Sequence, residues 1–227
     1  AQSLSDARAD ETEGRLHSFS ELSPALLWMS DPDGGCIHLN RAQRRFWGVG
    51  DDLGDFDYAA TLHPDDRDDI IARTMAANRE RQPFVVEGRY AHADGGWRVL
   101  RTEAQPRFDG AGRFLGMIGV NTDVTQARAA ERALRESESR FRLMADTAPS
   151  PVWLTGEEGE VEFVNEALVQ FYGLPADQIQ GHVWKQSIHA DDVPTVAAAQ
   201  AAARPTRQPY GFEARFARAD GEWRWMR

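Results

Sequence analysis

The segment Arg89-Tyr-Ala-His-Ala-Asp-Gly-Gly-Trp97-Arg98 returns 126 residues later, with three changes, as Arg215-Phe-Ala-Arg-Ala-Asp-Gly-Glu-Trp223-Arg224. In each copy an Asp-Gly pair separates two short runs, which is typical of the tight turn between two antiparallel strands. The repetition indicates that the chain contains the same hairpin twice.

The repeat extends upstream, where four residue pairs match at an offset of 125: Trp28 with Trp153, Asn40 with Asn165, Phe46 with Phe171, and Gly48 with Gly173. The offset changes by one residue between the two blocks, as expected when a loop absorbs an insertion. A period this long does not fit a solenoid and predicts two tandem globular domains. Arg227 corresponds to Arg101, so we expect the second domain to lack its last strands.

The composition is that of a folded, acidic chain. Of its 227 residues, 41% are apolar and 27% are charged, which suits two domains of about 100 residues each. The formal net charge of -10 disfavours a nucleic-acid partner, because phosphate binding requires a basic face. The single Cys36 excludes an intrachain disulfide, and no apolar run is long enough to cross a membrane. We therefore expect a cytoplasmic fragment without membrane contact, whose parent protein could be anchored elsewhere.

Local patterns predict an α+β domain. The expected elements are, in order, strands Leu26–Ser30 and Cys36–Asn40, helices Arg41–Trp47 and Pro64–Arg81, and strands Phe84–Ala91, Trp97–Phe108 and Phe114–Asp123. Asn40 and Gly48 are residue types that favour the start and the end of a helix. A five-stranded antiparallel sheet with helices on one face is the economical packing for this order.

These residues together resemble a known family, the PAS sensor domain with its C-terminal PAC motif. The resemblance rests on motifs in a fixed order: Asn40 and Asn165 after the second strand, His63-Pro-Asp-Asp66 and His189-Ala-Asp-Asp192, the two Asp-Gly hairpins, and Gly116-Met-Ile-Gly-Val-Asn-Thr-Asp123-Val-Thr125. The His-Pro-Asp-Asp start resembles one subclass of the family, from which Ala190 departs. The resemblance implies a tail or helix at 1–15, a first PAS/PAC domain at 16–124, a connecting signalling helix at 125–145 and a second, truncated PAS domain at 146–227.

The resemblance implies a regulatory function rather than a catalytic one. Such domains are sensory input modules of bacterial signal transducers, so the chain is expected to bind a small ligand or partner and to pass a signal through the helix. The expected output domain is a histidine kinase of a two-component system. The alternative is a ligand-free dimerisation or interaction module of a diguanylate cyclase or another transducer. No constellation of catalytic groups occurs in the sequence, so we expect the fragment not to be an enzyme.

The connecting segment has the spacing of a heptad seam. Apolar or small residues recur at alternating intervals of three and four: Ala127, Ala130, Leu134, Ser137, Phe141, Met144 and Ala148. Two interpretations stay open, a linker that packs on its own domains and a parallel homodimer contact. Asp123 and Thr125 stand where they can cap the helix start, and with Leu134 and Phe141 they are the expected signal-transmission residues.

Candidate ligand-binding residues come from aromatic positions and from one difference between the copies. The aromatic side chains of Trp28, Phe46, Trp97, Trp153 and Phe171 are expected in the cores, where they could alternatively form a ligand cage. In the long helix, Ile71 and Met75 align with Ala197 and Ala201. Missing volume in a close-packed interior is filled by neighbours, water or a ligand. The second domain, once complete, is therefore expected to have the more open cavity, unless these alanines face solvent.

No cofactor or metal is expected. Family members that bind flavin covalently use a cysteine in a helix, whereas Cys36 is predicted on a strand. Members that bind heme use a histidine within the long helix, and residues 65–81 and 191–204 contain none. The histidines of the chain also lack metal-binding spacing.

Overall fold

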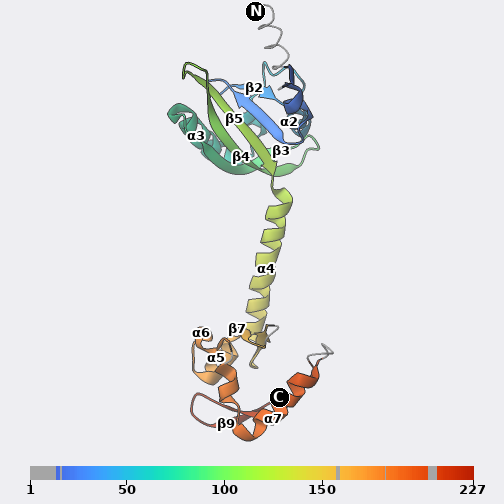
Figure 1. The fold of residues 1–227 in the computed structure, drawn as a ribbon, viewed down its shortest axis with the longest axis vertical. Coiled ribbons are helices and arrows are strands. Elements are labelled where there is room, and N and C mark those ends of the chain that lie inside the picture. The colour runs from blue at the N-terminus through green and yellow to red at the C-terminus, as the bar shows by residue number, and fades with distance from the viewer. Residues whose placement is uncertain (1–13, 16, 157–158, 182, 204–208) are drawn as a thin grey trace, which may run out of the picture. The chain divides into compact units, whose positions relative to one another are not determined.

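The computed structural model of the protein describes residues 14–15, 17–156, 159–181, 183–203 and 209–227 (Figure 1). The chain divides into two compact units, residues 1–132 and 133–227, which we call unit 1 and unit 2. Of the expected tail or helix at 1–15, residues 1–13 lie outside the described part, and residues 17–22 are helical.

Unit 1 is built on one antiparallel sheet with the strand order β2-β1-β5-β4-β3 (Figure 1). The strands are β1 (Leu26–Ser30), β2 (Cys36–Leu39), β3 (Phe84–Ala91), β4 (Trp97–Phe108) and β5 (Phe114–Asp123). The last strand, β5, pairs with both β1 and β4 and so joins the two hairpins into one sheet. The predicted five-stranded antiparallel sheet is confirmed, with β2 one residue shorter than expected.

The register of the sheet places alternate side chains on a buried face. On β4, Leu100, Thr102 and Ala104 are buried, whereas the residues between them are exposed. Trp28 of β1 lies opposite Gly119 of β5. A Cβ atom at position 119 would lie 2.4 Å from the Trp28 indole, so only glycine fits at this point of the sheet.

Two helices pack on the buried face of the sheet. In α2 (Arg41–Trp47), the Asn40 side chain accepts a hydrogen bond from Gln43 N and Gly48 ends the helix in the left-handed conformation. After the short 3-10 turn η1 (Tyr58–Thr61), α3 (Pro64–Glu80) starts with His63 as its N-cap. The capping residues predicted from the sequence are confirmed.

The core of unit 1 joins the helices to the sheet. Its buried cluster takes one residue from α2, one from α3 and four from the neighbouring strands and loop: Phe46, Ile70, Leu62, Val86, Tyr90 and Leu100. Each large buried aliphatic or aromatic side chain of this kind contributes about 1.5–3 kcal/mol to folding. The cluster therefore fixes both helices on the inner face of the sheet.

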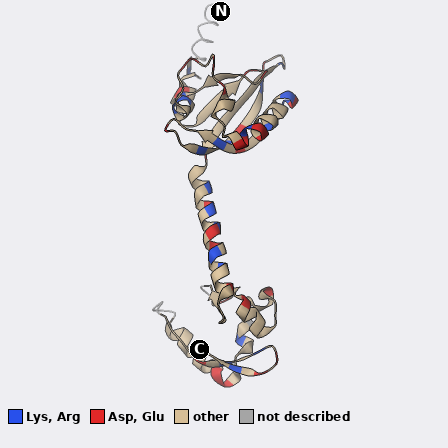
Figure 2. Ribbon diagram, turned by 180° about the vertical axis from the view of Figure 1, so that it is seen from behind, with Lys and Arg blue, Asp and Glu red and all other residues tan. Residues whose placement is uncertain are grey.

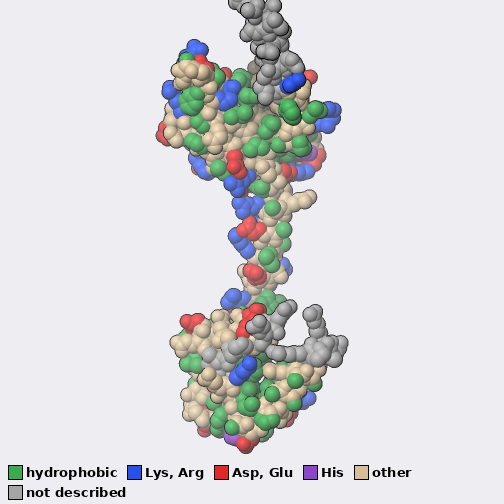
Figure 3. Space-filling view, viewed as in Figure 1, with side chains coloured by type: hydrophobic (Ala, Val, Ile, Leu, Met, Phe, Trp, Pro, Cys, Tyr) green, Lys and Arg blue, Asp and Glu red, His purple; other side chains and the backbone are tan. Residues whose placement is uncertain are grey.

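The connecting helix is α4 (Thr125–Thr147), two residues longer than the predicted signalling helix. Basic and acidic residues alternate along the helix (Figure 2). In the view of Figure 3, charged side chains lie along one side of it and hydrophobic side chains along the other. Leu134 and Met144 of the predicted seam are 60% and 65% exposed. These two side chains of the seam are therefore exposed.

Unit 2 repeats the order of the first strands and helices in shorter form. Its elements are β6 (Trp153–Thr155), β7 (Val161–Val164), α5 (Glu166–Tyr172), α6 (Ala176–Ile179), η2 (Val183–Ser187), η3 (Ala190–Asp192), α7 (Val193–Ala203), β8 (Ala214–Ala217) and β9 (Trp223–Met226). The strands form two separate antiparallel hairpins, β6-β7 and β8-β9. No described strand of unit 2 takes the place that β5 has in unit 1.

Two small cores replace the single core in unit 2. One gathers around Val161 and Leu168 beside the first hairpin, and the other around Val196 and Phe216 beside the second. Where unit 1 has Pro64, unit 2 has Ala190, and a short 3-10 turn precedes the helix α7. The loss of the proline therefore changes the start of this helix, although its histidine cap remains.

Candidate functional site

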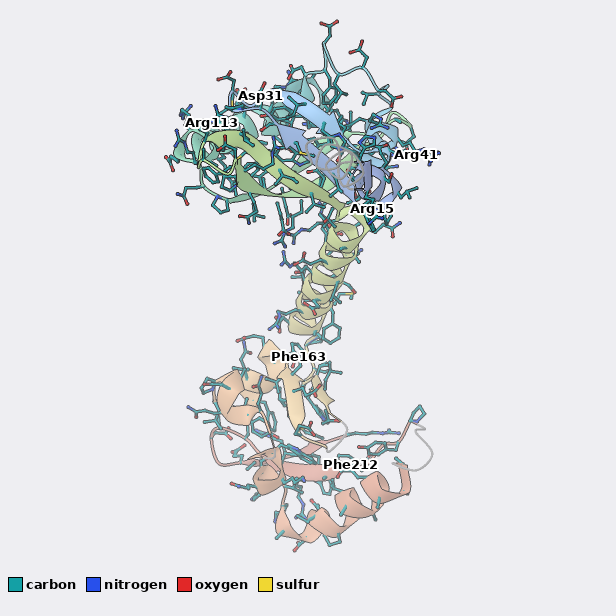
Figure 4. All side chains as sticks on the ribbon, turned by 45° about the horizontal axis from the view of Figure 1, so that its top comes forward. Arg15, Asp31, Arg41, Arg113, Phe163 and Phe212 are labelled. Atoms are coloured by element: carbon teal, nitrogen blue, oxygen red, sulfur yellow. The ribbon has the colours of Figure 1, made fainter. Side chains whose placement is uncertain are left out.

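Unit 1 contains a cavity of about 70 Å³ between the inner face of the sheet and the helices α2 and α3. Residues from the sheet, both helices and the intervening loops line it: Trp28, Ser30, Gly34, Cys36, Leu39, Trp47, Tyr58, Thr74, Met75, Asn78, Phe84, Tyr90, Thr102, Met117 and Asn121. Asp31, in the turn between β1 and β2 that also carries the lining residue Gly34, is labelled in Figure 4. This cavity is the candidate ligand site.

The described lining of this cavity carries no side chain that is charged near neutral pH. None of its residues is Asp, Glu, Lys, Arg or His. Burial raises the pKa of the Cys36 thiol to about 11 and, as the main cause, that of the Tyr90 hydroxyl to about 12. Both groups therefore stay protonated and neutral, and the walls favour an uncharged guest.

A chain of neutral hydrogen bonds lies along the sheet side of the cavity. The Thr102 hydroxyl on β4 donates to Asn121 Oδ1 on β5 at 2.7 Å. Asn121 Nδ2 then donates to Gln43 Oε1 on α2 at 2.8 Å. The two bonds link β4 and β5 to α2, so a change in the cavity wall can alter the contact between the sheet and this helix.

Two polar atoms of the wall residues are buried without a hydrogen-bond partner among the described residues. They are the indole nitrogen of Trp47 and Oδ1 of Asn78. The other amide atom of Asn78, Nδ2, donates to the Pro32 carbonyl at 2.8 Å. Buried polar groups are almost always paired, so these two atoms mark places where a partner is missing.

The start of α4 is bonded to the strands that line the cavity. Asp123 Oδ1 accepts from the backbone nitrogen and the hydroxyl of Thr125, and Thr125 Oγ1 accepts from Val99 N at 2.8 Å. One turn further, Arg128 forms a 2.7 Å ion pair with Glu87 of β3. Asp123 and Thr125, predicted at this junction, thus tie the helix to β4 and β5.

Each unit holds the helix before its first strand through one fully buried asparagine. Asn40 Oδ1 accepts from Leu27 N and Gln43 N, and its Nδ2 donates to the carbonyls of Ser20 and Ala25 at 2.9 and 2.8 Å. It also lies 3.3 Å from the Ser23 carbonyl. The prediction of a helix cap is confirmed. The bonds from Asn40 to Ser20 and Ala25 also hold the preceding helix and the chain after it, and we call this set of asparagine bonds the latch.

Asn165 makes the same set of bonds in unit 2. Its Oδ1 accepts from Val152 N and Leu168 N, and its Nδ2 donates to the carbonyls of Ala145 and Ser150 at 2.8 and 3.0 Å. All four partners lie 125 residues after the partners of the first latch. Because Ala145 belongs to α4, the end of that helix is the entry helix of unit 2.

Aromatic contacts add to the hold of unit 2 on the end of α4. Phe141 lies with its ring centre 5.2 Å from that of Phe163 on β7, and Arg142 lies over the same ring. Phe163 is labelled beside the last turns of α4 in Figure 4. Of the two seam residues predicted to transmit a signal, Phe141 is thus docked on unit 2 and Leu134 is exposed.

A second repeated contact joins the long helix to the third strand. Arg89 donates through Nε and its backbone nitrogen to Asp66 Oδ2 and through Nη2 to Oδ1. Arg215 makes the same bonds to Asp192. The arginine hydrogen bonds lower the pKa of both carboxyl groups to about 2. We call each pair a clamp, since it fixes the start of the helix to the sheet.

The sequence-predicted ligand residues of unit 1 separate into three groups. Trp28 and Met75 line the cavity. Phe46 and Ile71 belong to the core cluster beside it. Trp97, expected in the core, is 45% exposed and lies with its ring edge against His63 at the start of α3. The last expectation is wrong because the hairpin places this residue on the outer surface.

The predicted ligand residues of unit 2 do not gather around a large space. Trp153 lines a cavity of about 20 Å³, and Phe171 packs on the second of the two cores. Ala197 and Ala201 are exposed and line neither cavity. Of these two cavities the larger lies in unit 1, and in unit 2 Val196 occupies the place of Ile70. The more open cavity was expected of the second domain once complete, and this stays a prediction.

Several wall residues escaped the sequence analysis. Trp47, Asn78 and Thr74 line the cavity, and none belongs to a motif shared by the two copies. In the sequence, Thr74 and Asn78 are polar residues among the apolar residues of α3. A helix that faces solvent tolerates polar side chains at the same positions, so they did not indicate a cavity wall. Only the fold shows that they face the sheet.

Two further observations bear on cofactors and membranes. Among the described residues, no group of three or more His, Cys, Asp and Glu side chains is arranged to hold a metal ion. In the same part of the chain, no helix has the length and apolar character of a membrane span.

The strand order, the helices on one face and the internal cavity of unit 1 define a small α+β domain. A family model described as the PAS fold matches residues 37–121 and 161–227. The chain belongs to this family.

Relatives of the chain include sensor proteins. It is 32% identical over 210 residues to an uncharacterized protein, y4lL, of Sinorhizobium fredii, covering 92% of this chain and 25% of that protein. It is 29% identical over 175 residues to the two-component sensor PprA of Pseudomonas aeruginosa, covering 73% and 18%. A solved sensory box histidine kinase/response regulator from Burkholderia thailandensis is 27% identical, with a TM-score of 0.43, over 56% of this chain and 98% of that one. The chain thus spans a quarter or less of these two sequence relatives.

Proposed function

We propose that the chain is a non-catalytic sensory input module that binds a small ligand in the unit 1 cavity and transmits a signal through α4. The output is a domain of the parent protein, with a histidine kinase as the first candidate. The matches to the two-component sensor PprA and to the sensor protein FixL support this output. The candidate ligand is neither flavin nor heme, because Cys36 lies on β2 and α3 contains no histidine.

The observation that carries the proposal is that the same strands serve the cavity and the helix. Thr102 on β4 and Asn121 on β5 line the cavity, and β4 also receives the first turn of α4 through Val99 and Thr125. Filling or emptying the cavity shifts the population of strand arrangements, and a tied helix follows. A partner in place of a ligand would use the same path.

We also propose that unit 2 is a second PAS domain that is completed by a further strand in the place of β5. The two latches and the two clamps support this, because they recur at equivalent positions of both units. The recurrence of His63 and His189 as helix caps favours the subclass with the His-Pro-Asp-Asp start.

The proposed active form is a cytoplasmic homodimer that pairs the exposed seam of α4. Leu134→Glu places a charge on the seam, and we expect it to lower the dimer fraction in analytical ultracentrifugation at least several-fold. Ser139→Glu adds the same charge off the seam and is the matched control. A wild-type chain that is monomeric at all concentrations would exclude this part of the proposal.

Ligand binding is tested by blocking the cavity. Cys36→Phe fills it from β2, whereas Ile37→Phe adds the same ring to the exposed side of that strand. Native mass spectrometry of the purified wild type and of Ile37→Phe should show a small co-purified molecule that Cys36→Phe lacks. If all three carry nothing, while Leu134→Glu still abolishes the dimer, the ligand-free dimerisation module is the better account.

A further inference from the structure

We infer that β3, the edge strand of unit 1, passes a change in the cavity on to α4. Glu87 of β3 and Arg128 of α4 are the positioning residues of this step, because their ion pair joins the strand to the helix. The inference rests on the proposed function and adds the route that the signal takes through unit 1. This route differs from the contact between Val99 and Thr125, which ties the helix start to β4.

β3 belongs to the cavity wall and is bonded directly to the start of α3. Phe84 and Tyr90 of the strand line the cavity. Arg89 forms the clamp to Asp66, and its carbonyl accepts a hydrogen bond from His63 N at 2.8 Å. α3 supplies three further lining residues, so the strand and the helix border the same interior space.

A close contact between α3 and β3 lies next to this clamp. Gly88 is a buried position of β3, and a Cβ atom there would lie 2.1 Å from Ile70 Cδ1 on α3. The residues 126 positions later in unit 2 are Ala214 and Val196, which are buried in one core. The larger strand residue is thus matched by a smaller helix residue, and both units keep the helix directly on the strand. Because interiors are close-packed, a displacement of either element is transmitted to the other.

The opposite face of β3 carries the contact to α4. Glu87 lies between the buried residues Val86 and Gly88, so its side chain points away from the cavity. Arg128 donates to both of its carboxylate oxygens, through Nε at 3.0 Å and through Nη2 at 2.8 and 2.7 Å. Arg128 Nη1 donates to Glu131 Oε2 at 2.8 Å one turn further along the helix. Such a forked pair fixes the orientation of the two elements as well as their distance.

The place of β3 in the sheet lets it move more easily than β4. Among the described strands, β3 has β4 as its one neighbour, whereas β4 is paired on both sides. A shift of an edge strand disturbs one ladder of hydrogen bonds, and a shift of a central strand disturbs two. A change in α3 therefore displaces β3 first, and Glu87 carries this displacement to Arg128.

Hydrogen exchange of the backbone amides of residues 128–132 in the intact chain tests the ion pair. This exchange reports how firmly the first turns of α4 are held. Glu87→Gln and Arg128→Gln should each speed it about 2- to 5-fold, the range for a partly exposed ion pair. The double variant should add nothing, because the two residues act as one contact.

Filling the cavity tests the route. In the otherwise wild-type chain, Cys36→Phe should change the exchange of residues 128–132 at least about 2-fold. In the Glu87→Gln chain it should have no effect. Glu103→Gln is the matched control, since it neutralises a carboxylate on the same face of the sheet that pairs with Arg101 and not with α4. The effect of Cys36→Phe should persist in this control.

A second pair of variants perturbs β3 from the side of α3. Gly88→Ala pushes the strand and the helix apart and should change the same exchange about 2-fold, again only while Glu87 is present. Ile70→Val combined with Gly88→Ala reproduces the residue pair of unit 2 and should restore the wild-type rate. This rescue stands as the test by itself if Cys36→Phe does not fold.

The outcomes separate the route from the function on which it rests. If the effect of Cys36→Phe persists in Glu87→Gln, the route through β3 is overturned and the proposed function stands. Loss of the effect in Thr125→Ala would then assign the route to β4. If Cys36→Phe leaves the exchange of residues 128–132 unchanged in the otherwise wild-type chain, the transmission that the proposed function requires is absent, and both fail.

Discussion

Unit 1 and unit 2 share two sets of polar contacts, the latch and the clamp, but differ in their sheets. Both hold the preceding helix through a buried asparagine, and both clamp the start of the long helix through an Asp–Arg pair. In unit 1, β5 joins two hairpins into one sheet, whereas the two described hairpins of unit 2 remain separate. The difference shows that these contacts form without a complete sheet.

The cavity depends on the complete sheet. In unit 1, Met117 and Asn121 of β5 form part of the wall, and unit 2 has no described counterpart of this strand. The second unit instead splits into two small cores on either side of Trp184, which packs against both. A central strand is therefore needed to enclose a single interior large enough for a guest.

The largest effect is expected where the two units are most alike. Asn40→Ala removes four hydrogen bonds and leaves backbone groups buried without partners, which should lower the free energy of unfolding of unit 1 by about 3 kcal/mol. Asn165→Ala makes the same change in a smaller unit, and we expect it to unfold unit 2 entirely. Hydrogen exchange resolved by residue measures both effects.

Aspartate variants at the two latches provide the control. Asn40→Asp and Asn165→Asp keep the oxygen that accepts two backbone N–H groups and lose the bonds to the preceding helix. They should fall between the wild type and the alanine variants. Unchanged amide protection of unit 2 in Asn165→Ala would show that the latch does not stabilise it.

An intermediate effect is expected from acid, and it should be alike in the two units. The folded-state pKa of Asp66 and Asp192 is about 2, whereas a free aspartate titrates near 4. The clamps therefore stabilise the fold fully above about pH 4, and this contribution is lost as the pH falls toward 2.

Amide variants isolate the clamp contribution. Asp66→Asn should lower the melting temperature of unit 1 at pH 7 and have little effect near pH 2, and Asp192→Asn should do the same in unit 2. Asp68→Asn, on the exposed face of α3, is the control and should show no such pH dependence. A constant difference between Asp66→Asn and the wild type across this range would contradict the prediction.

The smallest effect concerns a residue at the end of α3 in unit 1. Arg81 has a φ of 56°, a left-handed conformation that costs a residue with a side chain about 1–2 kcal/mol. Its guanidinium also lies 5.7 Å above the Phe114 ring, an exposed contact worth about 0.5 kcal/mol. Because the strain exceeds the contact, Arg81→Gly should raise the stability of unit 1 by a few tenths of a kcal/mol or more in urea unfolding.

The local elements of unit 1 were predictable from the sequence because short-range chemistry determines them. Strand alternation, the caps Asn40 and Gly48, and the Asp-Gly turn gave the bounds of most elements within a residue or two. The cap function of Asn40 was predictable as well. Its bonds to Ser20 and Ala25 were not, since they join residues that only the tertiary fold brings together.

The candidate site was less predictable for the same reason. Counting side-chain volume along the long helix pointed to Ala197 and Ala201, because residue size is visible in the sequence and the facing direction is not. Apart from Gln200, α7 consists of apolar or small residues, so no periodic pattern separates its buried face from its exposed one. The aromatic Trp97 was misplaced because a hydrophobic residue beside a turn can pack on either face of a hairpin.

The match of Ser20 with Ala145 places the boundary of the repeated segment inside a helix rather than in a loop. A gene duplication with this boundary copies a domain together with the end of the helix that enters it. The length of the helix between Arg128 and Ala145 then sets the rotation of unit 2 about the helix axis. Each residue inserted or deleted there turns the part of the chain that follows by about 100°. Natural length variants of this segment should therefore differ by steps that preserve the phase, such as seven residues, more often than by one or two.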